Sequence, residues 1–188
     1  MQDHLILDIE TCPLDIGQYE QLDEEERKKL LNPIDCKVVA IGLRHNEQNI
    51  IFLDEDEKKV LEQFWKLFEQ KRLGGTQIVG FNIALFDIPF LVVRSFINNV
   101  QIVPFTIKYV VDLREKINAY RPQPSRGTLK DFAAAMGLED KGDGSQVPFL
   151  CKNKEWGKLR EYLAHDLFIT DKMFHRLKDL NILDIQKW

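Results

Sequence analysis

The sequence predicts one α/β domain, residues 1–188, in which helices cover a sheet of mixed strand direction. Two observations lead to this class. Three short apolar segments follow one another near the N-terminus, and beyond them strand-like segments alternate with segments of helical periodicity. A chain of 188 residues is also long enough to bury a sizeable core.

The first three strands are expected at residues 5–9, 37–44 and 49–53, where apolar and β-branched side chains dominate. A short polar turn around Asn46 joins the second strand to the third. Consecutive strands joined by a tight turn pair antiparallel, so this part of the chain predicts a three-strand meander.

Residues 13–35 separate the first two strands and carry an acidic run followed by a basic one. Such a segment predicts a short solvent-exposed helix. A mobile flap beside the first strand is the alternative interpretation.

Helices and strands alternate from residue 56 onward. Residues 56–71 form an amphipathic pattern, and Gly74-Gly75 predicts its end. Strands are expected at 77–80 and 108–113, with a helix at 88–96 between them. These later strands alternate with helices, as in parallel sheets. The inward side chains of the 56–71 helix are Val60, Leu61, Phe64, Leu67 and Phe68.

The last third of the chain begins with a proline-rich loop, residues 118–128, that carries two arginines. A helix containing residues 132–136 follows, with Thr128 as its N-cap and Gly137 at its end. A further helix is expected around residues 156–170.

Asp8 and Glu10 stand at the end of the first strand, two residues apart. On a strand such residues point to the same face, so their carboxylates lie side by side. Neighbouring carboxylates repel each other, and one keeps its proton unless a cation lies between them. The pair therefore predicts a site for Mg²⁺ or Mn²⁺, which prefer oxygen ligands. An acidic, solvent-exposed strand end is the alternative.

Asn82 and Asp87 follow the strand at 77–80. Asp87 begins the helix 88–96, with Pro89 in its first turn. Taken alone, Asp87 is interpreted as the N-cap of this helix. A capping carboxylate can also be an outer metal ligand, so both roles stay open.

Tyr162 and Asp166 lie four residues apart in the late helix and therefore share one helix face. Leu159, Leu163 and Leu167 repeat at the same spacing, which predicts a buried stripe. Asp166 could ligate a metal while the phenol positions a water molecule. A core role for Tyr162 is the alternative.

The order and spacing of these acidic motifs resemble those of the DEDD superfamily of 3′–5′ exonucleases, which have an RNase H-like fold. The resemblance covers most of the chain and predicts a single 3′–5′ exonuclease domain. Asp8 and Glu10 match the first motif of that family, Asp87 the second and Asp166 the third. A Tyr four residues before the last Asp marks one branch of the superfamily, and Tyr162 fits it.

The other branch has His five residues before the last Asp, where this chain has Glu161. His165 is out of register for that branch and is interpreted as a flanking residue. Four further segments resemble stand-alone exonucleases related to the exonuclease domain of family B DNA polymerases. These segments are residues 32–42, 110–113, 129–138 and 141–147.

The resemblance implies hydrolysis of phosphodiester bonds at a site of two divalent cations, Mg²⁺ or Mn²⁺. Asp8 would bridge the two ions. Glu10 and Asp166 would hold the ion that activates water, and Asp87 would hold the other, at the leaving 3′-oxygen. Tyr162 would orient the attacking water, because a phenol with a pKa of about 10 is a poor base at neutral pH.

Candidate substrate contacts lie beside these motifs. The terminal base would stack on Phe81 or Phe86, and backbone N–H groups near the first motif would meet the 3′-hydroxyl. The complete set of expected substrate-binding residues is Ile9, Thr11, Phe81, Asn82, Phe86 and Lys141.

The net charge of −4 argues against a broad nucleic-acid-binding surface. Residues 1–107 carry 11 basic and 18 acidic side chains, whereas residues 108–160 carry 11 and 7. The basic region thus lies between the second and third motifs and predicts weak, salt-sensitive contact with a few nucleotides. Its candidate residues are Arg121, Arg126, Lys130, Lys141, Lys152, Lys154, Lys158 and Arg160.

The expected partner is the 3′ end of single-stranded nucleic acid, with DNA favoured over RNA and with a polymerase or repair protein acting in trans. The sequence shows no membrane-length apolar stretch, no secretory signal, and neither a zinc pattern nor a disulfide framework among its three cysteines. A cytoplasmic protein with reduced thiols is therefore expected. An RNA-trimming enzyme, a small-oligonucleotide hydrolase and a non-catalytic nucleic-acid-binding module stay as alternatives.

Overall fold

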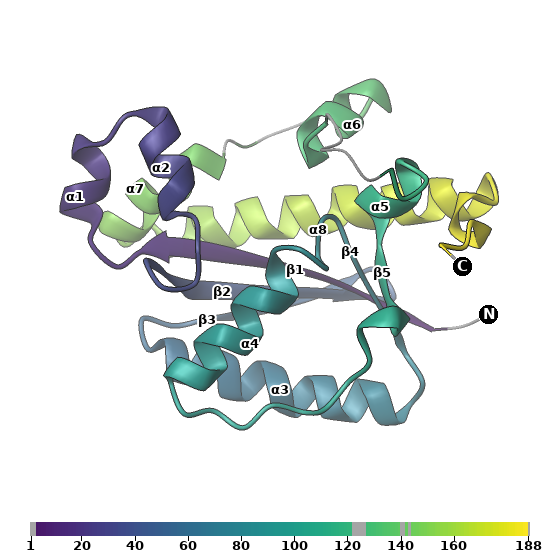
Figure 1. Cartoon of the computed structure of the whole chain (residues 1–188), viewed down its shortest axis with the longest axis horizontal. Helices are drawn as coiled ribbons and strands as arrows, with labels where there is room; N and C mark the ends of the chain where they lie inside the picture. Colours follow the sequence, from purple (N-terminus) through teal and green to yellow (C-terminus); the bar gives the residue numbers. More distant parts are fainter. Residues whose placement is uncertain (1–2, 122–126, 140–141, 143, 188) are drawn as a thin grey trace.

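The computed structural model describes residues 3–121, 127–139, 142 and 144–187 (Figure 1). Within this part of the chain one sheet has the strand order β3-β2-β1-β4-β5. The strands are β1 (His4–Pro13), β2 (Cys36–His45), β3 (Gln48–Leu53), β4 (Gln77–Gly80) and β5 (Val110–Asp112).

Strand direction divides the sheet into two parts. β2 pairs antiparallel with both β1 and β3, which confirms the predicted meander. β4 pairs parallel with β1, and β5 pairs parallel with β4. The mixed sheet expected from the sequence is therefore present.

The longest helices cover opposite faces of this sheet (Figure 1). α3 (Glu57–Leu73) and α4 (Asp87–Ile97) lie on one face, and α8 (Trp156–Asp179) crosses the other. No helix among the described residues is long and apolar enough to cross a membrane. The shorter helices are α1 (Ile16–Gln21), α2 (Glu24–Leu30), α5 (Leu113–Ile117), α6 (Leu129–Ala135) and α7 (Val147–Lys152).

Alternate side chains of β1 pack into two separate hydrophobic cores, one on each face of the sheet. Leu5, Leu7 and Ile9 pack into the core beneath α3 and α4, whereas Ile6 packs beneath α8. Because successive side chains of a strand point to opposite faces, Asp8 lies on the α8 face together with Ile6.

α3 and α8 match the predicted patterns. Val60, Leu61 and Phe64 of α3 are completely buried, and Leu67 is partly buried against the same core. Leu159 of α8 is also completely buried, as are Leu163 and Leu167. The two apolar stripes thus hold their helices to opposite faces of the sheet.

Both ends of α6 follow the sequence prediction. Thr128 and Asp131 form a capping box at its start. Gly137 follows its end with a left-handed φ of 75°, a conformation that favours glycine. Residues 122–126 of the proline-rich loop lie outside the described residues.

Three sequence predictions need correction. Residues 13–35 contain two helices instead of one, because Asp23 caps α2 with its own capping box. The strand expected at 108–113 is shorter, since residues 107–109 form a 3₁₀ turn. Asp112 ends β5 by accepting hydrogen bonds from Arg114 N and Glu115 N at the start of α5.

The third correction concerns the start of α4. Phe86, and not Asp87, occupies the N-cap position, and it makes no side-chain capping hydrogen bond. Asp87 is the first residue of the helix, and its carboxylate accepts a hydrogen bond from Ile9 N of β1. That difference bears on the acidic site.

Gly42 brings α8 close to the sheet. It pairs with Asp8 across β1 and β2, so both residues face α8. A Cβ atom at this position would lie 2.8 Å from both Leu163 Cγ and Leu167 Cδ1. The missing side chain therefore sets the depth at which α8 packs.

We predict that Gly42→Ala lowers the free energy of unfolding by about 1–3 kcal/mol, because the added methyl overpacks a filled core. Urea unfolding measures the change. Leu163→Ala removes one side chain that the methyl would meet, so the double variant should lose less than the sum of the two single losses. Strictly additive losses would contradict the proposed contact.

Candidate active site

Three carboxylates that are far apart in the sequence meet between β1 and α8. Asp8, Glu10 and Asp166 each offer an oxygen, and these oxygens all lie within 4.8 Å of one another. Glu10 is only 8% exposed and Asp166 only 7%, whereas Asp8 is partly exposed. The structure thus brings together the first and third predicted motifs.

The local structure explains this convergence. Asp8 and Glu10 occupy alternate positions of β1 and so point toward α8. The pairing of β1 with β2 changes register directly after Glu10, an irregularity of the kind that re-aims side chains beside functional sites. On α8, Leu163 and Leu167 flank Asp166 and are anchored in the core.

Asp87 lies beside this group of three. It is 3% exposed, and its Oδ1 accepts a hydrogen bond from Ile9 N at 3.1 Å. Its carboxyl group also hydrogen-bonds with the side chain of Asp8. The first turn of α4 is therefore tied to β1 between the two carboxylates of the first motif.

Burial raises the pKa of Asp8 well above its usual value, and the neighbouring carboxylates, Asp87 first, raise it further. Burial likewise raises the pKa of Glu10, followed by the charge of Asp166, while Lys130 acts in the opposite direction. The pKa of Asp87 is raised to about 7, chiefly by burial. Without a cation, this cluster retains protons near neutral pH.

This donor set fits a hard divalent cation. Carboxylate oxygens are the ligands that Mg²⁺ and Mn²⁺ prefer. A bound cation would also remove the mutual repulsion that raises these pKa values. Asp8, Glu10 and Asp166 are the residues placed to hold it.

Tyr162 stands one helical turn before Asp166 and is partly buried. Burial raises the pKa of its phenol, with the charges of Asp166 and Glu10 as the next causes, and its hydroxyl hydrogen-bonds with Asp166. The phenol therefore stays protonated at neutral pH and acts as a hydrogen-bond donor. Lys130 Nζ lies 5.8 Å from the centre of its ring.

A cavity of about 520 Å³ opens beside Glu10. Ile9, Thr11 and Phe86 line it, together with Arg27 from α2. Its size lies within the range of small-molecule and cofactor sites. The segment between β1 and β2 thus contributes a wall beside the acidic group.

The two aromatic residues expected to stack on the terminal base lie in different surroundings. Phe86 lines the cavity, while Phe81 packs against Phe132 of α6 at a ring-centre distance of 5.8 Å. The Ile9 amide, expected to contact substrate, instead donates to Asp87. Thr11 lines the cavity and is 8% exposed.

Comparison with known proteins relates this geometry to a family. A family profile described as a predicted 3′–5′ exonuclease related to the exonuclease domain of PolB matches residues 29–108. An uncharacterized protein of Methanocaldococcus jannaschii is 36% identical over 167 residues, which cover 82% of this chain and 93% of that protein. The chain belongs to this PolB-related family of predicted 3′–5′ exonucleases.

A solved family B DNA polymerase from the hyperthermophilic archaeon Pyrobaculum calidifontis shares the fold. The TM-score is 0.72 at 19% sequence identity, and the match covers 97% of this chain. The chain spans 25% of the polymerase's length. This comparison shows the fold alone: the same arrangement of sheet and helices occurs within that polymerase.

The profile match includes Asp87 of this exonuclease-family chain but ends before Tyr162 and Asp166, and it begins after Asp8. The fold is what places those residues beside Asp87. Lys141, one of the expected substrate contacts, lies outside the described residues.

Asn82 has a structural role that its motif did not reveal. It adopts a left-handed φ of 60°, and its amide oxygen accepts a hydrogen bond from Arg114. Asp112 accepts hydrogen bonds from Asn82 N and Ala84 N and so fixes the loop that leads to Asp87. The sequence signal for Asp112 was an acidic residue at the end of a short apolar strand.

For two residues that the sequence had only included in larger sets, the structure supplies the contact. A Cβ atom on Gly142 would lie 2.2 Å from Tyr162 Cδ2, so this glycine packs directly against the phenol ring. Lys130 was one of eight basic candidates, and the structure singles it out through its proximity to Tyr162 and its effect on the pKa of Glu10. Only long-range geometry distinguishes these two residues.

We predict that, in EDTA, the free energy of unfolding falls as pH rises from about 4 to about 8. The pKa values of Asp8, Glu10 and Asp87 are raised in the folded state, so the folded protein holds protons that the unfolded chain has already released. This contribution to stability is therefore fully present below the unfolded pKa values and is lost as pH rises through the folded ones; the folded pKa of Asp87 is about 7.

Urea unfolding at a series of pH values measures this dependence. Asp87→Asn should flatten the fall, and saturating Mn²⁺ should reduce it by binding the folded state. A stability that rises across the same pH range in EDTA would contradict the raised pKa values.

Proposed function

We propose that this chain is a divalent-metal-dependent 3′–5′ exonuclease that removes nucleotides from single-stranded nucleic acid, with DNA as the favoured substrate. The observation that carries the proposal is the meeting of Asp8, Glu10 and Asp166 with the protonated phenol of Tyr162. Membership of the PolB-related exonuclease family supports the reaction, and the relation to a DNA polymerase domain favours DNA.

The acidic group supplies the metal ligands of this proposal. Asp8, Glu10 and Asp166 would hold one divalent cation, Mg²⁺ or Mn²⁺. Asp8 would share a second cation with Asp87, whose carboxyl group lies in hydrogen-bonding contact with it. When bound, such a pair of ions lowers the pKa of water and stabilises the charge on the leaving oxygen.

Tyr162 would act as a positioning donor. Its raised pKa excludes it as a base near neutral pH, whereas a protonated hydroxyl beside Asp166 can orient a water molecule. Gly142 packs directly against its ring, and Lys130 Nζ lies 5.8 Å from the ring centre. The chain thus fixes the direction of the hydroxyl before substrate arrives.

The cavity beside Glu10 is the proposed site of the terminal nucleotide. Phe86 offers an aromatic face for the base, and stacking of this kind tolerates any sequence. Arg27 and Lys28 bring positive charge to the same cavity and would meet phosphate. Glu10 and Glu24 line the cavity as well, so its lining carries both signs of charge.

We expect 5′-labelled single-stranded DNA to shorten from its 3′ end in Mg²⁺ or Mn²⁺ and to stay intact in EDTA. Asp8→Ala and Asp166→Asn should each lower the rate at least about a hundredfold, because each removes a metal ligand. Tyr162→Phe should lower it less, by about five- to tenfold, since it removes one neutral hydrogen bond. Asp179→Asn, at the exposed end of α8, is the matched control and should retain the wild-type rate.

Full activity of Asp8→Ala would refute the proposed chemistry. RNA and dinucleotides of matched sequence belong in the same assay. Faster cleavage of RNA would favour an RNA-trimming enzyme, and cleavage of dinucleotides alone would favour a small-oligonucleotide hydrolase. Binding of single strands without cleavage of any substrate would favour a binding module.

A second prediction concerns the ring of Tyr162. Gly142→Ala should lower the cleavage rate by about as much as Tyr162→Phe, because the new methyl displaces the phenol from Asp166. Gly157→Ala is the matched control, since its Cβ would meet nothing within 4 Å. Equal rates for the two alanine variants would show that the position of the ring does not matter.

A further inference from the structure

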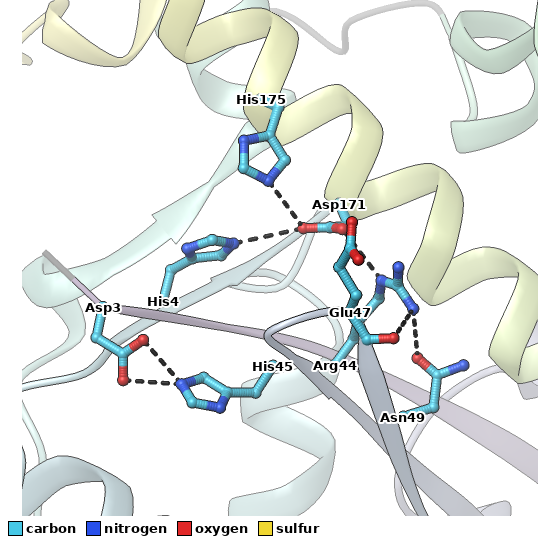
Figure 2. Close-up of polar contacts among 8 residues, drawn as sticks. All are labelled: Asp3, His4, Arg44, His45, Glu47, Asn49, Asp171 and His175. Carbon is cyan, nitrogen blue, oxygen red and sulfur yellow. Dashed lines mark hydrogen bonds and ion pairs between the residues drawn. The ribbon is translucent and has the colours of Figure 1, made fainter. Parts of the chain in front are cut away.

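A second group of potential metal ligands lies away from the acidic site. His4, Asp171 and His175 each offer one ligand atom, and these atoms lie within 4.8 Å of one another. Asp171 Oδ1 is 3.4 Å from His4 Nε2 and 3.5 Å from His175 Nε2. Figure 2 shows this oxygen facing both imidazole rings.

The same two elements carry both groups. His4 begins β1, four residues before Asp8, so the two residues are about 13 Å apart along the strand. Asp171 and His175 follow Asp166 on α8 and lie one helical turn apart. The histidine cluster (His4, Asp171 and His175) therefore occupies the far end of the β1–α8 interface.

Surrounding contacts hold the carboxylate of Asp171 in place. Arg44 Nε donates to Asp171 Oδ2 at 3.1 Å, which leaves Oδ1 directed at the imidazoles. Arg44 in turn donates to Glu47 O and Asn49 Oδ1, both at 3.0 Å (Figure 2). Such outer contacts fix the orientation of metal-ligating carboxylates.

The imidazole of His4 is also held by packing. Its ring stacks on Phe174 with 4.3 Å between ring centres. His45 is not part of this cluster. Its Nε2 instead contacts both carboxylate oxygens of Asp3 at 2.8 Å (Figure 2). His4 and His175 are therefore the two imidazoles that share one carboxylate oxygen.

Two separations within the cluster match the spacing of ligands around a tetrahedral ion. Zn²⁺ binds imidazole nitrogen at about 2.0–2.1 Å, so two of its tetrahedral ligands lie about 3.3–3.4 Å apart. The two separations from Asp171 Oδ1 to the imidazole nitrogens, 3.4 Å and 3.5 Å, are close to this spacing. Two imidazoles and one carboxylate also suit a zinc-like ion better than Mg²⁺.

We propose that His4, Asp171 and His175 form a binding site for a transition-metal ion of the zinc class, with a fourth ligand from solvent. The side chains of His4 and His175 are 21% and 48% exposed, which leaves solvent access to the site. The bound ion links the start of β1 to α8. Because Arg44 already neutralises Asp171, the affinity is lower than that of a zinc site with four protein ligands.

This site does not depend on the proposed nuclease activity, and its test uses a chain without the acidic group. The full chain carrying Asp8→Asn and Asp166→Asn is freed of metal with a chelator and titrated with Zn²⁺ by calorimetry. We expect one Zn²⁺ per chain and a higher melting temperature with the ion, because the ion binds the folded state.

His175→Ala in the same background should weaken Zn²⁺ binding at least about tenfold and remove the gain in melting temperature. This side chain is half exposed, so the variant is expected to fold. His4→Ala is the second test of the same site. His165→Ala, on the same helix but outside the cluster, is the matched control and should bind as before.

Absence of Zn²⁺ binding in the parent background would overturn the proposal. Binding that survives both His175→Ala and His4→Ala with unchanged affinity would overturn it as well, because the ion would then lie elsewhere.

Discussion

The electrostatic repulsion among the clustered carboxylates between β1 and α8 is the constraint on which the structure of this exonuclease-family chain depends. Asp8, Glu10 and Asp166 lie close enough to repel one another, and burial makes that repulsion stronger. The cores on either side of the sheet must therefore supply the free energy that keeps β1 and α8 together. The acidic group is stable as an arrangement because apolar packing surrounds it.

Small residues and a fixed loop hold the acidic side chains in this arrangement. Gly42 lets α8 approach the sheet, and Gly142 lies against the ring of Tyr162. Asp112 is buried at the end of β5 and holds the loop before Asp87 through backbone amides. None of these three residues needs to contact a substrate. Each sets the position of one that is proposed to act.

The sequence predicted what depends on local pattern. Alternation placed Asp8 and Glu10 on one face of a strand, and the leucine stripe that includes Leu163 identified α8. The sequence prediction was wrong where a residue distant in the sequence determines the role. Asp87 is not the N-cap of α4, because its carboxylate accepts a hydrogen bond from the Ile9 amide. The histidine cluster could not be predicted for the same reason, since His4 and Asp171 are 167 positions apart in the sequence.

α8 is one uninterrupted helix of 24 residues, and it carries both Asp166 and His175. The two residues are nine positions apart, which corresponds to about 13.5 Å along the helix. A helix of this length behaves as a stiff lever, so a tilt of about two degrees at the histidine end would move Asp166 by about 0.5 Å, the tolerance of a working catalytic geometry. A small movement at the histidine end of α8 would therefore shift Asp166 within the acidic group.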